Sequence, residues 1–462
     1  MANTLLESRV RKGDRVVFCL EKGLFFVVAH LASQKIGAIS VPLNPGFKKA
    51  ELTYLLGDAE PKVVFAGEAQ GAIISEIDGR LSVYVIDTKS PYQNARFFRS
   101  ASDSVPGIRL RPDDPGVVIY TSGTTGKPKG AVLTQQNLVH DATNIMRIWE
   151  ITSSDALCHA LPLFHVHGLC FALHTSLMAG AHVLMLDAFS PQTVVDFLAQ
   201  KDGDHACTMF MAVPSMYVKL LDGLGSRLFD FGHIRLWASG SAPLLVKDFE
   251  RIRKVFGKDP VEREGMSETG MNFSNLLRGK RKPGSIGLPL PALQVRVVDP
   301  ESLKEVDQGQ VGEIWIKGPG ITPGYWQKPE ATARAFADGW FRTGDLGRVD
   351  AEGYYYLTDR LKHIIISEGE NISPKEIESV INRFEGIAES SVVGIPDEQW
   401  GEKVVAAVVP KPGSALKAQE IRQLCKEQLH DWKCPKQILL VKELPRNTMG
   451  KVLKEEVKKL FA

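Results

Sequence analysis

Short apolar runs alternate with stretches of helical spacing in the first part of the chain. They follow one another in the order strand, helix, strand, helix, strand, strand at residues 15–20, 24–36, 38–41, 48–58, 62–66 and 82–86. Strand–helix–strand repetition favours right-handed crossovers, and such crossovers build a parallel sheet. The polar stretch 88–106 that follows predicts a loop.

The same alternation returns after this loop. Apolar runs predict strands at 116–120, 182–186, 208–212 and 234–238, and helical spacing marks 168–180 and 191–200. Residues 283–350 differ, because Gly and Pro become frequent and the predicted strands are short, at 294–298 and 313–317. This region predicts a smaller β-rich subdomain.

The last hundred or so residues carry their own set of elements. Helices are predicted at 375–383 and 416–429, and strands at 390–394 and 404–409. The pattern therefore predicts an α/β protein in which a large N-terminal domain, 1–358, holds parallel or mixed sheets with helices and the small β-rich subdomain. A short linker, 359–362, leads to a small α+β C-terminal domain, 363–462.

Composition narrows the classes of partner. The 462 residues are 44% hydrophobic and 24% charged, which is typical of a globular protein of two to four domains. Because 56 basic residues stand against 54 acidic ones, the net charge of +2 gives no general reason to expect nucleic acid or an anionic membrane as partner. The apolar stretches are too short to span a bilayer. Six scattered cysteines without a Cys-x-x-Cys pair predict reduced, buried thiols and a cytoplasmic location.

Candidate chemistry centres on residues 120–130, which follow the predicted strand at 116–120. Glycines, threonines, a serine and two lysines there offer backbone N–H groups, hydroxyls and positive charge, which together suit phosphate. The order is not that of the common phosphate loop, because Pro128 stands where Ser or Thr would follow Lys127. An ordinary surface turn is the alternative.

Seven motifs along the chain resemble the adenylate-forming superfamily, and in particular its acyl-CoA synthetases. In order they are TSGTTGKPKG (121–130), EGMSE (264–268), YWQKP (325–329), TGD (343–345), DRLK (359–362), SEGENISPKEIE (367–378) and PRNTMGK (445–451). The resemblance implies activation of a carboxylate by ATP to an acyl-adenylate with release of pyrophosphate, and then capture by coenzyme A as a thioester. The expected cofactors are ATP, Mg²⁺ and coenzyme A.

The resemblance also assigns residues to the nucleotide and the metal. Glu268 matches the family's Mg²⁺-binding glutamate, with Thr121 as a second metal contact, and a solvated loop carboxylate is the alternative for Glu268. Asp345 and Arg360 match the contacts to the ribose hydroxyls. The residues implied to hold the phosphates and the rest of the nucleotide are Thr121, Ser122, Gly123, Thr124, Thr125, Gly126, Lys129, Ser241, Ala242, Pro243, Glu264, Gly265, Met266 and Ser267.

Three further residues are implied in catalysis and domain rotation. Lys451 matches the catalytic lysine that bridges the attacking carboxylate and the α-phosphate during adenylation. Lys362 matches the hinge about which the mobile C-terminal domain rotates between the two half-reactions, and Gly369 would line the tunnel for the thiol. Without the resemblance, the sequence around Gly369 predicts a tight turn before a helix.

The chain departs from the family pattern in several places. Glu264 stands where an aromatic residue usually stacks on adenine, His363 replaces an acidic residue after the hinge, and Glu368 replaces the first of two glycines. The chain also begins later than family members do, which predicts a trimmed first subdomain or a truncated start.

Substrate choice rests on a second group of residues. His165 matches a gating residue beside the carboxylate, although a histidine next to an apolar helix is equally often part of the core. Ser239, Gly240, Arg263 and Met271 are similar to those of malonyl-CoA synthetases, in which an arginine at this position grips the distal carboxylate. Arg263 could instead only pair with neighbouring glutamates.

The alternatives to malonate or a related short dicarboxylate differ in substrate, acceptor and activity. Fatty-acid–CoA ligases can carry similar residues, so a medium- or long-chain fatty acid is one alternative. Delivery of the acyl group to a carrier-protein thiol and a non-catalytic nucleotide-binding homologue are the others. The expected partners are a small carboxylate and coenzyme A, and the sequence does not indicate an oligomeric state.

Overall fold

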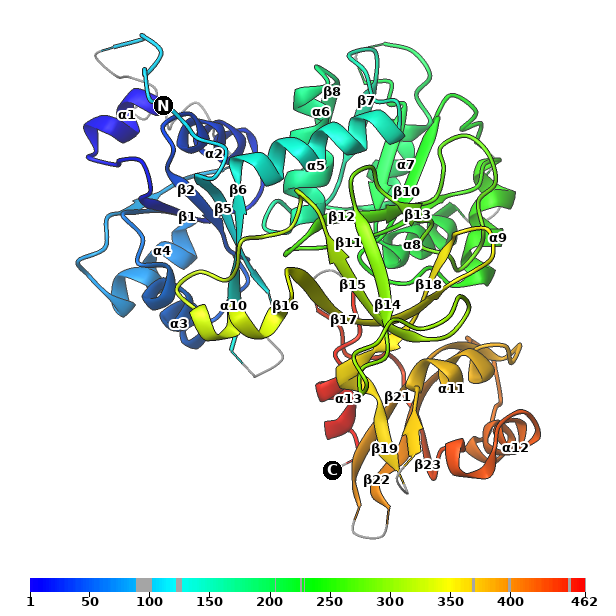
Figure 1. Cartoon of the computed structure of the whole chain (residues 1–462). Helices are drawn as coiled ribbons and strands as arrows, with labels where there is room; N and C mark the ends of the chain where they lie inside the picture. The colour runs from blue at the N-terminus through cyan, green and yellow to red at the C-terminus, as the bar shows by residue number, and fades with distance from the viewer. Residues whose placement is uncertain are drawn as a thin grey trace. The chain divides into compact units, whose positions relative to one another are not determined.

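The computed structural model describes residues 1–88, 102–121, 127–203, 205–224, 227, 229–367, 370–397, 400–447 and 450–461 (Figure 1). They form two compact units, Met1–Gln294 with Lys317–Phe341, and Val295–Ile316 with Arg342–Ala462. Most of the predicted loop 88–106 and the predicted site residues at 122–126, 368 and 369 lie outside the described residues. The hinge predicted at 359–362 lies inside the second unit and stays a prediction.

The first sheet carries the predicted strand–helix alternation. Its described strands lie in the order β4-β3-β1-β2-β5-β6, and every neighbouring pair is parallel except β5 with β6. The predicted parallel sheet is therefore confirmed, with an antiparallel edge. The elements are α1 (Ala2–Glu7), β1 (Arg15–Cys19), α2 (Leu24–Lys35), β2 (Ile39–Pro42), α3 (Lys49–Ala59), β3 (Val63–Ala66), α4 (Glu68–Ile77), β4 (Val83–Val85), β5 (Pro115–Thr121) and β6 (Lys129–Thr134).

The second sheet completes the first unit. Strands β8, β7, β9, β10 and β11 are parallel neighbours, and β12 and β13 continue the sheet antiparallel. The apolar run predicted as one helix is a π-helix, His167–His174, that continues into α6. The other elements are α5 (Gln135–Ile148), β7 (Ala156–His159), α6 (Thr175–Met178), β8 (His182–Met185), α7 (Pro191–Leu198), β9 (Met209–Ala212), α8 (Pro214–Leu224), β10 (Leu236–Ser239), α9 (Val246–Phe256), β11 (Val261–Met266), β12 (Gly270–Ser274) and β13 (Leu288–Pro289).

Short strands form the predicted β-rich region. Strands β14, β15, β17 and β18, most of whose residues belong to the second unit, form one sheet. Strand β16 belongs to the first unit and pairs with Trp340 and Phe341, the first two residues of β17, which belong to the first unit as well. The elements are β14 (Gln294–Val298), β15 (Gly312–Lys317), α10 (Pro329–Ala335), β16 (Phe336–Ala337), β17 (Trp340–Val349) and β18 (Tyr355–Arg360).

The last part of the chain builds a sheet with helices, as predicted. The long strands β21 and β22 pair antiparallel, and β22 also pairs with β19 and β23, so β21 lies at an edge of the sheet. The buried side chains of β21 and β22 pack with those of α11 and α12. The elements are a 3₁₀ turn (Leu361–His363), β19 (Ile365–Ser367), β20 (Glu370–Ile372), α11 (Pro374–Ile381), β21 (Ile387–Asp397), β22 (Gly401–Pro410), α12 (Ala418–Gln428), a 3₁₀ turn (Asp431–Lys433), β23 (Gln437–Leu440) and α13 (Lys454–Lys459).

All six cysteines are free and buried, which confirms the predicted reduced thiols. Within the described ranges, no helix is both long enough and apolar enough to cross a bilayer.

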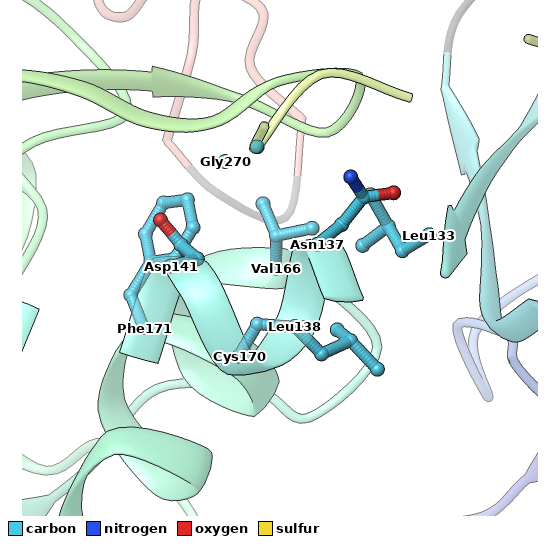
Figure 2. A pocket seen from close by; sticks show the side chains of 9 residues that line it. Leu133, Asn137, Leu138, Asp141, Val166, Cys170, Phe171 and Gly270 are labelled. Atoms are coloured by element: carbon cyan, nitrogen blue, oxygen red, sulfur yellow. The ribbon is translucent and has the colours of Figure 1, made fainter. Parts of the chain in front are cut away.

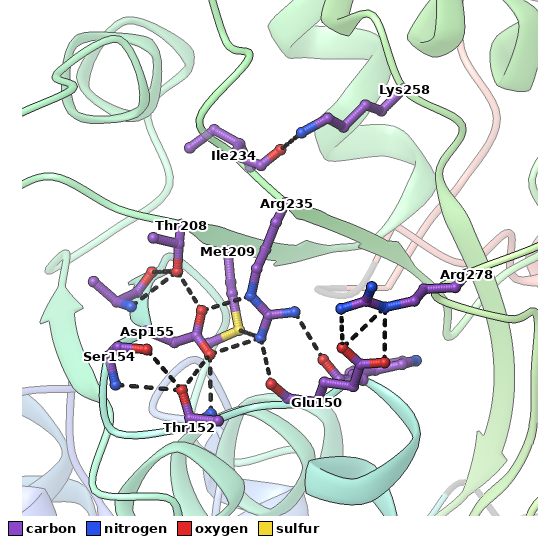
Figure 3. A network of polar contacts seen from close by, with 12 residues as sticks. Glu150, Thr152, Ser154, Asp155, Thr208, Met209, Ile234, Arg235, Lys258 and Arg278 are labelled. Carbon is purple, nitrogen blue, oxygen red and sulfur yellow. Dashed lines mark hydrogen bonds and ion pairs between the residues drawn. The ribbon is translucent and has the colours of Figure 1, made fainter.

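An ion pair with a buried carboxylate and a partly exposed guanidinium ties the residues just before β7 to those just before β10 (Figure 3). Arg235 donates from Nε and Nη2 to the two carboxylate oxygens of Asp155, each at 2.6 Å. The Thr152 amide and the Thr208 hydroxyl also donate to this carboxylate, at 2.9 and 2.8 Å. Burial by itself would raise the pKa of Asp155, but these hydrogen bonds outweigh it and lower the pKa.

Replacing Asp155 with alanine should lower the free energy of unfolding by about 3 kcal/mol, because it leaves the Arg235 guanidinium without its carboxylate. The wild-type contribution is present above the unfolded-state pKa of the carboxyl and is lost as pH falls through the lowered folded-state pKa. Urea unfolding followed by circular dichroism at several pH values measures both effects.

The neighbouring pair of Arg278 and Glu150 is the matched control, because its side chains are 81% and 47% exposed. Arg278→Ala should leave the urea midpoint unchanged, since exposed pairs are screened by water and salt. Equal losses of unfolding free energy in Asp155→Ala and Arg278→Ala would contradict the assignment of this stability to the pair of Asp155 and Arg235.

Candidate active site

The predicted phosphate loop connects two antiparallel strands. Thr121 ends β5 and pairs with Lys129, the first residue of β6. Strand β5 before the loop confirms the strand predicted at 116–120, and the loop leads into a second strand, β6, and not into a helix as the common phosphate loop does. The Lys129 ammonium lies 5.1 Å from the centre of the Tyr325 ring, so the ring holds a cation at the edge of the loop.

Glu268 meets this edge from the turn between β11 and β12. Its Oε1 accepts a hydrogen bond from the Tyr325 hydroxyl at 3.1 Å and one from the Thr121 hydroxyl at 3.5 Å. Glu268 is 8% exposed, which argues against the alternative of a solvated carboxylate. The structure thus brings together the two residues predicted to contact the metal.

The oxygen ligands around Glu268 fit Mg²⁺ of a nucleotide complex. Such an ion is usually held by one or two carboxylates together with substrate phosphates and water, and not by a full cage of protein ligands. Glu268 supplies the carboxylate, and Thr121 and Tyr325 add hydroxyls. The described residues contain no group of three or more His, Cys, Asp or Glu side chains that could bind a metal by themselves.

The Arg263 guanidinium, on β11, is buried and forms no hydrogen bond with the part of the chain that the structure describes. The residue is 2% exposed, and Nε, Nη1 and Nη2 all lack a partner among the described residues. The guanidinium lies 4.8 Å from the centre of the Phe171 ring. Burial lowers the pKa of Arg263 to about 10, with Glu264 and Asp141 opposing the shift, so the group is charged at neutral pH. Among the described residues no carboxylate hydrogen-bonds to the guanidinium, which argues against the alternative in which Arg263 only pairs with its neighbouring glutamates.

The turn after β10 lies against this guanidinium. A Cβ on Gly240 would come within 2.5 Å of Arg263 Nε, so only glycine leaves room for the side chain here. Ser239, the last residue of β10, is fully buried and its hydroxyl has no hydrogen-bond partner. Ser241 adopts a positive φ of 68°, and Ala242 and Pro243 continue the turn.

A half-buried and a buried histidine lie in the same region. The Nε2 atom of the half-buried His165 has no hydrogen-bond partner among the described residues, and loss of hydration lowers the pKa of His165 to about 4. His167 lies at the start of the π-helix, and its Nδ1 is 3.1 Å from the Ser241 hydroxyl. Burial, and then the charge of Arg263, lower the pKa of His167 well below its ordinary value. Both rings are therefore neutral at neutral pH.

Glu264, the residue expected at the adenine position, has a protein partner. Its Oε2 accepts a hydrogen bond from the Asn272 amide of the neighbouring strand at 3.1 Å. A β-bulge follows directly, where Gly265 faces Met271 and Met266 faces Gly270. Ser267 begins the turn that leads to Glu268.

The predicted ribose contacts pair with each other in the second unit. Asp345 on β17 and Arg360 on β18 are register partners and form an ion pair of 2.5 Å, and Asp345 is 5% exposed. Burial raises the pKa of Asp345, while Arg360 and Lys451 oppose the rise. The structure therefore places two of the predicted site residues, Arg360 and Lys451, around the carboxylate of a third, Asp345.

Lys451 is close enough to this pair to interact with it. Water reaches its side chain, yet surrounding protein and then Arg360 lower the pKa of Lys451 to about 8, while Asp345 opposes the shift. Loss of hydration and then Arg360 also lower the pKa of Lys362. Arg360, Lys362 and Lys451 thus gather around the Asp345 carboxylate.

Asp359 fixes the residues predicted as the hinge to the start of α11. Its Oδ2 accepts hydrogen bonds from the Ser373 hydroxyl and the Lys375 amide, both at 3.0 Å. The His363 ring, the departure from the family pattern, lies 3.7 Å from the other carboxylate oxygen. Burial alone would raise the pKa of Asp359, but the bonds from His363 and its other partners lower it to about 2.

Comparison with known proteins identifies the family of the chain. Residues 1–326 match the family described as AMP-binding enzyme, and residues 376–451 match its C-terminal domain. The chain belongs to the AMP-binding enzyme family. The predicted membership of the adenylate-forming superfamily is thereby confirmed.

Relatives of this AMP-binding enzyme include ligases that form coenzyme A thioesters. The mitochondrial malonate–CoA ligase ACSF3 of Bos taurus is 34% identical over 479 residues, which cover 96% of this chain and 81% of the relative. The crystal structure of ATP-bound MatB from Rhodopseudomonas palustris has a TM-score of 0.94 and 38% identity, over 100% of this chain and 91% of that chain. The o-succinylbenzoate–CoA synthetase MenE of Bacillus subtilis, in complex with ATP and magnesium ion, has a TM-score of 0.85 and 30% identity, over 99% and 92%.

Sequence reasoning missed several residues that this AMP-binding enzyme places in the site. Tyr325 lies in the YWQKP motif, but the sequence predicted no role for it. The sequence also predicted none for His167, Phe171 or Asp141. Asp141 lies on α5, a helix that was not predicted. A signal for it exists, because Thr134 and Asn137 form a reciprocal capping box at its start.

Proposed function

We propose that the chain is an ATP-dependent carboxylate–CoA ligase whose substrate is malonate or a closely related short dicarboxylate. The observation that carries the choice of substrate is the buried, charged guanidinium of Arg263, whose nitrogens have no hydrogen-bond partner among the described residues. A buried charge without a partner is costly, so the pocket is completed by an anion. A monocarboxylate would have its one anionic group at the reacting phosphate and would leave Arg263 unpaired.

The proposed adenylation depends on groups that accept negative charge. Attack of one carboxylate on the α-phosphate brings two anions together, so the site must supply positive charge and hydrogen-bond donors. Mg²⁺, when bound by Glu268 and Thr121, would neutralise part of the phosphate charge. Lys129 and the loop 122–126 would hold the departing pyrophosphate, and Asp345 with Arg360 would hold the ribose.

The proposed substrate pocket orients the second carboxylate with fixed groups. The fork of Arg263 offers a bidentate contact, and the Phe171 ring keeps the guanidinium in place. Neutral His165 and His167 can each donate or accept a hydrogen bond without adding charge. They can therefore orient the substrate acid, while Arg263 remains the positive charge that attracts its second carboxylate.

In the proposed thioester half-reaction Lys451 has no role. We propose that rotation about Lys362 withdraws Lys451 and admits coenzyme A along a tunnel at Gly369, which lies outside the described residues.

The reduced state of the six cysteines supports a reducing compartment such as the cytoplasm.

Pyrophosphate release, measured over a panel of acids with and without coenzyme A, tests this function. We expect release with malonate together with consumption of coenzyme A, and much weaker release with acetate or a long-chain fatty acid. Release only with fatty acids would favour the fatty-acid ligase instead. Adenylation without consumption of coenzyme A would favour a carrier-protein acceptor, and no release at all would favour a non-catalytic protein.

Glu268→Gln should raise the Mg²⁺ concentration needed for half-maximal pyrophosphate exchange by about 100-fold, because it replaces the charged ligand with a neutral amide. A Mg²⁺ titration of carboxylate-dependent exchange measures the shift. Tyr325→Phe is the matched variant, since it removes only a hydroxyl from Glu268 and should shift the titration far less. An unchanged Mg²⁺ dependence in Glu268→Gln would show that Glu268 does not bind the metal.

A further inference from the structure

Asp141 is a buried carboxylate of the first unit that the proposed reaction does not use. It lies on α5, is 7% exposed and lines a small pocket with Phe171, Cys170 and Gly270 (Figure 2). Figure 2 shows its carboxylate pointing toward Gly270. Its Oδ1 accepts a hydrogen bond from the Met271 amide at 2.8 Å.

This hydrogen bond fixes the start of β12 at the place where β12 faces the end of β11. Gly270 has a φ of +70°, and a Cβ there would come within 2.8 Å of Asp141 Oδ1, so the backbone can approach the carboxylate only as glycine. Met271 faces Gly265 across the β-bulge that follows Arg263 and Glu264. Asp141 therefore supports, from a separate helix, the strand pair that carries Arg263.

Asp141 also acts on the charge of Arg263 without occupying its donors. The two groups influence each other's pKa in opposite directions, as an anion and a cation do. Yet all three guanidinium nitrogens stay free of hydrogen bonds from the described part of the chain. Of the described residues, those that interact electrostatically with the carboxylate are Arg263 from β11, the Met271 amide from β12 and the Cys170 thiol from the π-helix.

We propose that Asp141 is a positioning and specificity-determining residue that holds Arg263 ready for the second carboxylate of the substrate and takes up a proton when that carboxylate binds. The inference rests on the proposed function, since it concerns the same end of the pocket. The substrate's carboxylate and that of Asp141 are like charges near one guanidinium, and like charges favour protonation of one of them. Oδ2 is the oxygen that takes the proton, because Oδ1 is held by the Met271 amide.

The coupling has a defined sign. Burial raises the pKa of Asp141 to about 7, while the Met271 amide and Arg263 oppose the rise. Above this value Asp141 is ionised and partly neutralises Arg263, so the dicarboxylate binds more weakly. Below it the carboxyl is neutral and binding is stronger. Because linkage is reciprocal, binding of the dicarboxylate must draw a proton from solution.

The test measures the KM for malonate in the malonyl-CoA reaction over pH values at which malonate stays a dianion. In the wild type, KM should rise roughly fivefold as pH passes from below to above the Asp141 pKa. Asp141→Asn keeps an oxygen acceptor for the Met271 amide but cannot ionise, so its KM should stay at the low-pH level throughout. Asp196→Asn, an exposed position on α7, makes the same chemical change elsewhere and should follow the wild type.

A second measurement keeps the proposal testable if Asp141→Asn does not fold. Calorimetry of malonate binding to the wild type, in buffers of different ionisation enthalpy, should show net proton uptake near neutral pH. A flat KM profile in the wild type, the same profile in Asp141→Asn as in the wild type, or binding without proton uptake would each overturn the role of Asp141. Each of these results can occur while malonyl-CoA is formed, whereas absence of malonyl-CoA at every pH would refute the proposed function itself.

Discussion

Replacing Arg263 with methionine should lower kcat/KM for malonate by about 100- to 1,000-fold, because truncating one partner of a buried, hydrogen-bonded charge pair costs several kcal/mol. Methionine keeps much of the volume beside Phe171 and removes the charge. Activity toward a monocarboxylate of similar length should hold or rise, since that acid no longer leaves a buried cation unpaired. Competition between the two acids for malonyl-CoA or acyl-CoA formation, resolved by chromatography, measures the change in preference.

Two further variants sharpen this result. Arg263→Lys keeps the positive charge but loses the planar fork, so it should recover only part of the preference for malonate. Arg251→Met removes an exposed arginine of α9 and should behave like the wild type. Unchanged selectivity in Arg263→Met would end the assignment of this residue to the second carboxylate.

Replacing Lys451 with alanine should abolish carboxylate-dependent pyrophosphate exchange, with a loss of about a thousandfold, because the lysine is expected to stabilise charge that develops only in the adenylation transition state. Capture of a supplied acyl-adenylate by coenzyme A should stay largely intact. The two half-reactions are measured separately, the first by exchange of labelled pyrophosphate into ATP and the second by thioester formation from the adenylate.

The surroundings of Lys451 add a pH dependence to this prediction. Since loss of hydration and then Arg360 lower the pKa of Lys451 to about 8, the wild-type adenylation step should weaken as pH rises past that value, while the thioester step should not. Lys459→Ala, on the exposed side of α13, is the matched lysine control. Equal loss of both half-reactions in Lys451→Ala would contradict a role confined to adenylation.

Much of the fold follows from local pattern. The alternation of apolar runs and helical spacing predicted the parallel sheet of β1, β2 and β3, because a strand buried on both faces needs a continuous apolar run. Helices α5, α8 and α9 were missed although they border the second sheet. The π-helix was predicted only as a helix. An apolar run has the same appearance in the sequence whether each backbone hydrogen bond spans four residues, as in an α-helix, or five, as in a π-helix.

The candidate site divides in a similar way. Motif residues such as Thr121, Glu268 and Asp345 could be named from sequence, because each lies in a short motif that is specific to a family. The pairing of Glu264 with Asn272 could not be, since it depends on the register of two strands and on a bulge between them.

The sequence by itself determined the family, the reaction class and the identity of most polar groups in the site. The tertiary structure decided which of those groups are already paired. Arg263 could have bonded to a neighbouring glutamate, and only the packing of β11, the π-helix and the turn at Gly240 leaves its nitrogens buried and without a hydrogen-bond partner among the described residues. Asp141 gains its place in the same way, because burial and hydrogen bonding are set by neighbours that are distant in the chain.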